Sequence, residues 1–135
     1  MNYFEVELVL RLLLGFMLSG VVGIEREGSL KPAGFRTHIL VGLGSTLLTI
    51  LSLEAFPNAD LSRIAASVIV GIGFLGAGTI IKTRKKVIGL TTAATLWIVA
   101  SIGVATGSGF YLLAIVATIL AFISLKMTIF ERKNQ

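Results

Sequence analysis

Five long apolar runs, separated by short polar connections, dominate this sequence. They cover about residues 6–24, 37–55, 64–81, 87–105 and 110–125. Each run approaches the ~20 residues that an α-helix needs to cross the hydrocarbon core of a bilayer. Only 14% of the residues are charged, whereas a soluble domain carries about 25%. We therefore predict an all-α integral membrane bundle of five transmembrane helices, which forms a single domain over residues 1–135.

The placement of the charged residues predicts the orientation of these helices. The connections alternate between two sides, and ten of the twelve Lys and Arg residues fall on the side opposite to the N-terminus. The other two are Arg63 and Arg11, which lies inside the first run. Because cytoplasmic loops carry the Lys and Arg excess, we predict the N-terminus outside and the C-terminus in the cytoplasm. Attraction to anionic lipid headgroups then accounts for the net charge of +5, and no nucleic-acid partner is needed.

The segment 71-GIGFLGAG-78 has the glycine spacing of a dinucleotide-binding loop. It lacks the preceding strand, and no acidic residue follows about 20 positions later, so we reject a nucleotide site. At about 100° per residue, Gly71 and Gly78 fall on one side of a helix, and Gly73 and Gly76 fall on the other. Small residues let membrane helices approach closely. We therefore predict that the third helix is the centre of the bundle and packs on both sides.

Two further helices carry single stripes of small residues. They are Gly15, Ser19 and Gly23 in the first helix, and Ala114, Ala117 and Ala121 in the fifth. These stripes predict close helix packing, either within one chain or in a homodimer or larger oligomer.

The fourth helix carries a possible polar seam of three threonines, Thr91, Thr92 and Thr95. Threonines in membrane helices often donate to their own backbone carbonyls three or four residues earlier. The alternative is a seam that faces neighbouring helices or a small hydrated cavity.

Ionisable residues within a membrane are candidate functional groups. Arg11 lies in the first helix, and Glu7 precedes it by four residues, the favourable order for an ion pair on one helix face. Either Arg11 extends outward to Glu7 and the headgroups, or it faces the bundle interior as a fixed charge.

A second charged group lies in 25-EREGSLKPAGFRTHI-39, which joins the first two helices. We expect Glu25 and Arg36 to meet at the cytoplasmic boundary, as a structural lock or as part of a functional site. A metal site there is an open question, because His38 is the only histidine and other ligand types would be required. The candidate functional residues of this cytoplasmic edge are Glu25, Arg26, Glu27, Arg36, Thr37 and His38.

Several long segments resemble the MgtC/SapB family of bacterial inner-membrane proteins. They are 23-GIERE-27, 33-AGFRTHILVGLGS-45, 63-RIAASVIVGIGFLGAGTII-81 and 87-VIGLTTAATLWIVASIG-103. The resemblance implies a five-helix membrane domain, with a functional site that includes the GxERE and RTH motifs. Virulence-associated MgtC members also carry a soluble C-terminal domain, so this chain looks like the short, SapB-like form. Phe35 replaces the leucine that is usual in the family.

The resemblance also implies a link to magnesium limitation, to survival inside host cells and to the modulation of a membrane ATPase. The residues themselves do not favour direct magnesium transport by a single chain. Mg²⁺ prefers six oxygen ligands, usually with one or two carboxylates. Near the membrane only Glu25 and Glu27 offer carboxylates on the predicted cytoplasmic side. One chain is therefore a poor magnesium conduit, although an oligomer could assemble one.

Three hypotheses for the function follow. The first is a regulatory protein that acts on a membrane partner, and the second is a small ion or solute transporter that uses the threonine seam with Arg11, Glu25 and Arg36. The third is an enzyme acting on lipid or isoprenoid substrates. A chain with no cysteine and one histidine has few groups for acid–base or thiol catalysis. We therefore favour the regulatory protein and predict neither catalytic residues nor a cofactor.

Overall fold

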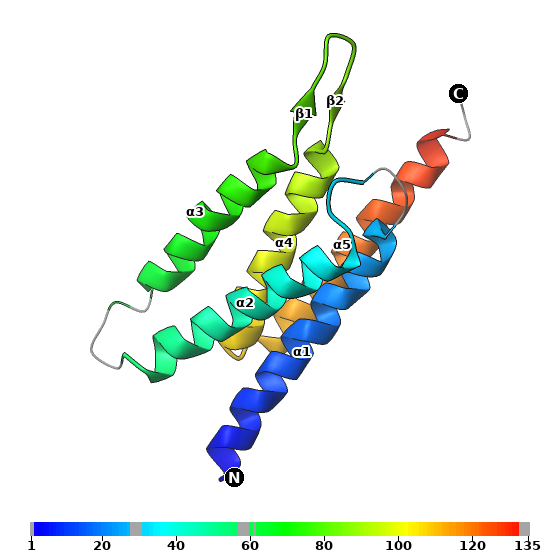
Figure 1. Cartoon of the computed structure of the whole chain (residues 1–135). Helices are drawn as coiled ribbons and strands as arrows, with labels where there is room; N and C mark the ends of the chain where they lie inside the picture. The colour runs from blue at the N-terminus through cyan, green and yellow to red at the C-terminus, as the bar shows by residue number, and fades with distance from the viewer. Residues whose placement is uncertain (1, 28–30, 57–59, 61, 133–135) are drawn as a thin grey trace.

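The computed structural model describes residues 2–27, 31–56, 60 and 62–132, with side chains up to Met127. Helices make up nearly all of this part of the chain, and one short antiparallel hairpin interrupts them (Figure 1). The elements are α1 (Tyr3–Arg26), α2 (Phe35–Glu54), α3 (Ser62–Gly78), β1 (Ile81–Lys82), β2 (Val87–Ile88), α4 (Leu90–Gly107) and α5 (Tyr111–Arg132).

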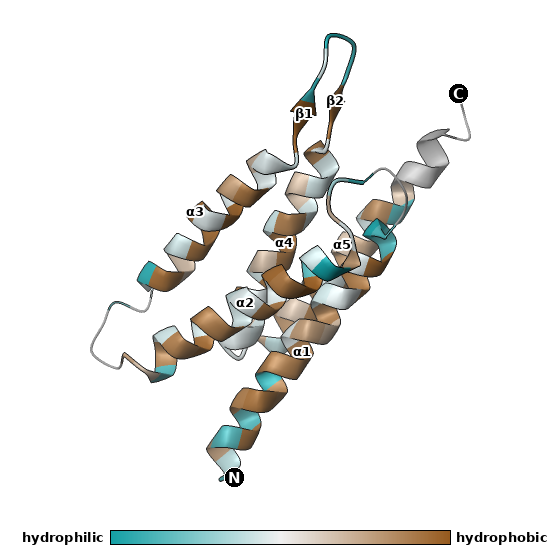
Figure 2. Ribbon diagram, viewed as in Figure 1, coloured by the Kyte–Doolittle hydropathy of each residue, from teal (hydrophilic) through white to brown (hydrophobic). Residues whose placement is uncertain are grey.

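The helices are those of a membrane bundle by length and composition. Within the described residues, α1, α2 and α4 are long and apolar enough to cross a membrane, while α3 and the Tyr111–Met127 part of α5 are shorter apolar helices. Apolar residues run along all five helices, and polar residues gather on the hairpin and at the start of α1 (Figure 2). The predicted all-α class is confirmed, and three of the helices have the length and composition of membrane-spanning helices. Crossing by all five helices and the orientation stay predictions.

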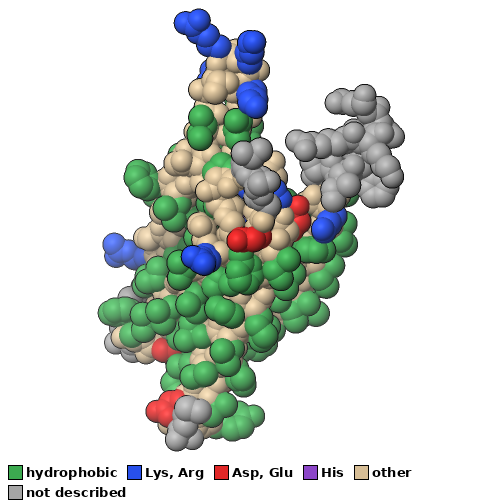
Figure 3. Space-filling model, turned by 45° about the vertical axis from the view of Figure 1, so that its right-hand side comes forward, with side chains coloured by type: hydrophobic (Ala, Val, Ile, Leu, Met, Phe, Trp, Pro, Cys, Tyr) green, Lys and Arg blue, Asp and Glu red, His purple; other side chains and the backbone are tan. Residues whose placement is uncertain are grey.

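The polarity of the interior and the surface is the reverse of that in a soluble domain. Many large apolar side chains are exposed, and on the face shown in Figure 3 they cover the middle of the molecule. Many buried side chains carry hydroxyl groups, and each of those named here donates to a backbone carbonyl one turn earlier, which satisfies it without water. They include Ser19, Ser45, Thr46, Thr49, Thr106 and Thr118.

The centre of the bundle is α4, which contacts each of the other four helices. The prediction that the third helix is central is wrong. Its only buried residues are Ile72 and Gly76, and it packs mainly along α4. An added methyl group would meet no described atom within 4 Å at the other three glycines of the predicted packing faces. These are Gly71, Gly73 and Gly78.

Glycines determine the close crossings of α1, α2 and α4 instead. A methyl group on Gly15 would clash with the Thr46 side chain, and one on Gly42 would clash with Ser19. On α4, a methyl group on Gly103 would lie 2.6 Å from the Gly42 carbonyl oxygen. Without a Cβ at these positions, the backbones approach closely enough for extensive van der Waals contact. The stripe predicted in the first helix therefore packs against α2.

The apolar runs predicted over 64–81 and 87–105 include residues that form the hairpin rather than helix. Ile81 pairs with Ile88, and Lys82 pairs with Val87. Gly89 adopts φ 94°, a conformation that favours glycine, and it serves as the N-cap of α4. The hairpin carries the basic residues that connect α3 to α4. It projects from the C-terminal end of α3 and the N-terminal end of α4 (Figure 1).

Candidate functional site

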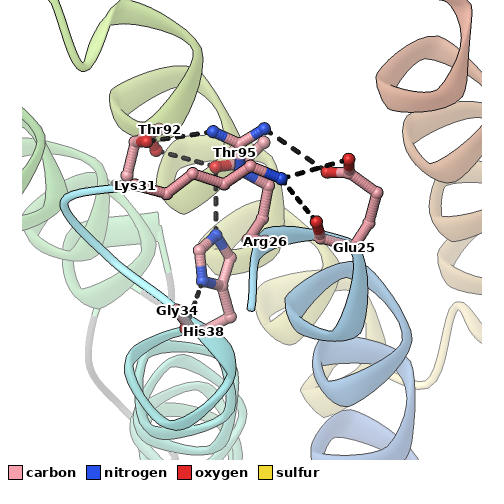
Figure 4. A network of polar contacts seen from close by, with 7 residues as sticks. All are labelled: Glu25, Arg26, Lys31, Gly34, His38, Thr92 and Thr95. Carbon is pink, nitrogen blue, oxygen red and sulfur yellow. Dashed lines mark hydrogen bonds and ion pairs between the residues drawn. The ribbon is translucent and has the colours of Figure 1, made fainter. Parts of the chain in front are cut away.

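A buried polar network joins the end of α1, the start of α2 and the start of α4 (Figure 4). We call it the Arg26 cluster. It comprises Glu25, Arg26, Lys31, Gly34, His38, Thr92 and Thr95. The chain brings these groups together because α1 and α2 are consecutive helices and both pack against α4.

Arg26 provides the link between α1 and α4. Its side chain is 9% exposed. Nη2 donates to Thr92 Oγ1 at 3.1 Å, and Nη1 lies 3.3 Å from Glu25 Oε2. Among the described residues, Nε is a buried donor without a hydrogen-bond partner. An unsatisfied buried donor is costly, so this guanidinium has capacity for a further acceptor.

Glu25 forms ion pairs with Arg26 and Lys31, whereas the predicted partner is Arg36. Besides Arg26, its carboxylate binds Lys31 Nζ at 3.2 Å, and Lys31 also donates to the Glu25 carbonyl oxygen at 2.6 Å. Arg36 is exposed and stands outside the cluster, so the expected contact between Glu25 and Arg36 is wrong. Lys31 is closer along the chain and reaches Glu25 across the connection.

The remaining residues of the predicted cytoplasmic edge have other environments. Glu27 is exposed, and its carboxylate accepts from the Phe35 backbone N–H at the start of α2. That contact satisfies an amide that has no partner within the helix. Thr37 is exposed and lines a groove between α2 and α3. Of the six predicted edge residues, only Glu25, Arg26 and His38 belong to the buried cluster.

His38 is fully buried and connects α2 to α4. Its Nδ1–H donates to the Gly34 carbonyl oxygen at 2.7 Å, because a carbonyl can only accept. Its Nε2 lies 3.0 Å from Thr95 Oγ1. The Thr95 hydroxyl hydrogen can be donated either to this nitrogen or to the Thr92 carbonyl oxygen, 2.8 Å away. The imidazole therefore contacts the Thr92–Thr95 turn of α4. Whether this contact is a hydrogen bond depends on the direction of the Thr95 hydroxyl hydrogen.

The predicted threonine seam divides into two parts. Thr92 and Thr95 are buried in the Arg26 cluster, whereas Thr91 is exposed on the side of α4 that faces α5. Thr95 Oγ1 lies within hydrogen-bond distance of its own helix backbone, as the first interpretation predicts, and of His38 Nε2, as the second predicts. Both interpretations therefore describe part of what Thr95 does.

Arg11 forms a second polar group at the opposite end of the bundle. It forms an ion pair with Glu7, as the four-residue spacing predicts. Nη1 donates to the Gly107 carbonyl oxygen at 2.9 Å, and Nε donates to the Tyr111 hydroxyl at 3.1 Å. Arg11 is 15% exposed and faces the α4–α5 connection. It therefore joins three helices rather than only extending outward.

We expect Tyr111→Phe to weaken this second polar group. The change removes a hydroxyl that accepts from Arg11 and donates to Glu7 at 3.1 Å. The free energy of unfolding in detergent should fall by about 0.5–1.5 kcal/mol, as for one hydrogen bond. Tyr3→Phe is the matched control, because Tyr3 is 92% exposed. Equal effects of the two changes would show that the hydroxyl of Tyr111 has no bridging role.

The Arg26 cluster contains several hydrogen-bond donors, and two of its side chains, Arg26 and Lys31, are positively charged. In the described part of the chain, no three His, Asp or Glu side chains lie together as metal ligands. Sequence reasoning missed the roles of Lys31 and Gly34, and it did not connect Thr92 with Arg26. The contact between Arg26 and Thr92 spans 66 residues. A signal for Lys31 was present, since it lies six residues after Glu25.

Comparisons with known proteins identify the family. The MgtC family model matches residues 12–132. The chain is 41% identical over 129 residues to "Putative magnesium transporter YhiD" of Escherichia coli K12, covering 90% of this chain and 60% of the relative. It is 38% identical over 133 residues to SapB of Bacillus subtilis, covering 92% and 57%. It is 43% identical over 112 residues to MgtC of Salmonella typhimurium strain 14028s, covering 83% and 48%.

The chain spans about half to three fifths of the length of these relatives, and SapB, like the other two, extends beyond the shared region. No solved structure matches the chain. The family model covers nearly all of the residues that form the bundle and the whole Arg26 cluster, whereas Glu7 and Arg11 of the second polar group precede its first residue. With this match and the three relatives at about 40% identity, the chain belongs to the MgtC family.

Proposed function

We propose that this protein is a non-catalytic regulator of magnesium-linked ion homeostasis in the bacterial inner membrane, and that it acts by binding a transmembrane helix of a partner protein. The setting includes the stress adaptation that accompanies virulence. The name of the relative YhiD, "Putative magnesium transporter", supports the link to magnesium and the membrane. The observation that carries the mode of action is the open groove beside α3.

This groove lies between α2 and α3 and has a volume of about 680 Å³. Its lining is mostly apolar, and small residues from both helices form part of it. A methyl group on Gly44 or Gly71 would meet no described atom within 4 Å. The residues that matter for close approach are Gly44, Ser45, Ser67 and Gly71.

A membrane helix fits this groove better than a soluble partner does. The described groove residues are uncharged, and a helix at membrane depth needs no charged contacts. Association of helices in a bilayer depends on close van der Waals packing, which small residues permit. The outer face of α3 adds large apolar side chains, with Val70 76% and Phe74 83% exposed. A partner helix could pack against these while it approaches Gly71. A membrane ATPase is one partner with such helices.

A second candidate function is transport of a small ion or solute, which one observation favours. The Arg26 cluster places a buried imidazole, a guanidinium and a carboxylate between helices. Such groups in a membrane protein often belong to ion or proton pathways. An oligomer of this chain would then supply the rest of the pathway.

The partner hypothesis is tested with Gly71→Leu, which should fill the groove without disturbing the bundle. In cells that depend on this protein for growth at low magnesium, we expect normal membrane-inserted yield but loss of growth. Gly73→Leu is the matched control, because Gly73 is equally open but does not line the groove. Growth that is normal in both variants would contradict a role for the groove.

A photo-crosslinking residue at position 71 distinguishes the possible occupants. We expect a crosslink to another membrane protein that disappears when Gly44→Leu is introduced on the facing helix. A crosslink only to a second copy of this chain would replace the partner by a homodimer. Magnesium flux into proteoliposomes that contain the protein alone, reduced by Arg26→Gln, would favour the transporter instead.

A further inference from the structure

A second groove lies between α4 and α5 and is separate from the one beside α3. Its volume is about 500 Å³, and its lining is largely apolar. Ala94 and Leu120 are exposed there, so the groove opens on the outer surface of the bundle. Its lining includes Thr91, Ala94 and Thr95 of α4, and Ala117, Leu120 and Leu125 of α5.

Thr95 connects this groove to the Arg26 cluster. It lines the groove and contacts His38, and the adjacent turn of α4 presents Thr92 to Arg26. On α1, Val22 lies one turn before Arg26 and belongs to the same apolar cluster as Leu125, a lining residue of the groove. The apolar groove and the buried guanidinium therefore lie at the same end of the bundle.

The charges at this end favour an anion. Within the cluster, Arg26 and Lys31 share the single carboxylate of Glu25; the Glu27 carboxylate is exposed outside the cluster and accepts from the Phe35 amide. The cluster therefore has one more positive charge than negative charges, and the buried Nε of Arg26 has no partner among the described residues. The N-terminus of α4 also lies here, and its N-cap Gly89 has no side chain to accept from the first amides. Helix N-termini favour negative charge.

We propose that the Arg26 cluster and the α4–α5 groove together bind one anionic phospholipid. The phosphate interacts with Arg26 and Lys31, and an acyl chain lies along the groove beside Ala94. Charge complementarity selects a lipid with a net negative headgroup, and the apolar lining selects a lipid over a free anion. The predicted orientation places this end at the cytoplasmic leaflet, whose surface carries negative charge.

The test uses the purified protein in a neutral detergent and follows its thermal unfolding midpoint. Short-chain phosphatidylglycerol should raise the midpoint in a saturable manner, because a ligand that binds only the folded state stabilises it. Phosphatidylcholine of the same chain length and inorganic phosphate should have little effect. Equal effects of phosphatidylcholine would overturn the role of the cluster in selecting charge. Equal effects of inorganic phosphate would overturn the lipid as ligand.

Two variants test the two halves of the site without removing Arg26. Lys31→Gln should weaken phosphatidylglycerol binding about tenfold, and Ala94→Phe should weaken it at least as much by filling the groove. Ala66→Phe is the matched control, because Ala66 is exposed on α3 and lines neither groove. Unchanged binding in Ala94→Phe, or no response of the unmodified protein to phosphatidylglycerol, would overturn the proposal.

Discussion

Replacing Arg26 by glutamine is expected to lower the free energy of unfolding by about 3–5 kcal/mol, the usual cost of breaking a buried ion pair. The substitution removes the bond to Thr92 and one of the two cations that face Glu25. Because Lys31 remains beside Glu25, we expect a value toward the lower end of this range. Equilibrium unfolding in mixed detergent micelles measures the change.

Arg36→Gln is the matched control for this change. Arg36 lies near the start of α2, the helix end that contributes to the Arg26 cluster, but its side chain is exposed. We expect an effect within about 0.5 kcal/mol, as for most surface substitutions. If Arg36→Gln were as destabilising as Arg26→Gln, the assignment of Arg26 as the buried link between α1 and α4 would be wrong.

The second large effect is expected for Gly103→Ala. The new methyl group would lie 2.6 Å from the Gly42 carbonyl oxygen and 2.7 Å from Ser45 Cβ. Because a backbone atom cannot move aside as a side chain does, α2 and α4 must separate. Overpacking of this kind costs about 1–3 kcal/mol or more. The same unfolding measurement should show this loss.

Gly73→Ala makes the same chemical change where the structure has room. A methyl group there meets no described atom within 4 Å, and alanine favours a helix over glycine by about 1 kcal/mol. We therefore expect an unchanged or slightly higher free energy of unfolding. A loss as large as that of Gly103→Ala would contradict the arrangement in which α3 stands apart from the close crossings.

Local features of the chain were predicted well because their physical causes are local. The five apolar runs predict the helices, since hydrophobic length is a property of consecutive residues. The pair of Glu7 and Arg11 follows from one helical turn, and the back-bonding of buried threonines follows from the same geometry. In α1, the stripe of small residues that contains Gly15 predicts a close crossing. The prediction holds because the Thr46 side chain of α2 packs directly against Gly15.

The remaining features depend on which helices pack against one another. The amino-acid sequence by itself determined the membrane class, the helices and the local pairs, because each depends on residues within a few turns of one another. Only the tertiary structure decided that α4 is central, that Gly103 rather than Gly71 lies at a tight crossing, and that Arg26 rather than Arg36 meets the polar core. A glycine permits close approach but does not specify which helix approaches, and a buried arginine binds whichever distant acceptor the packing brings to it.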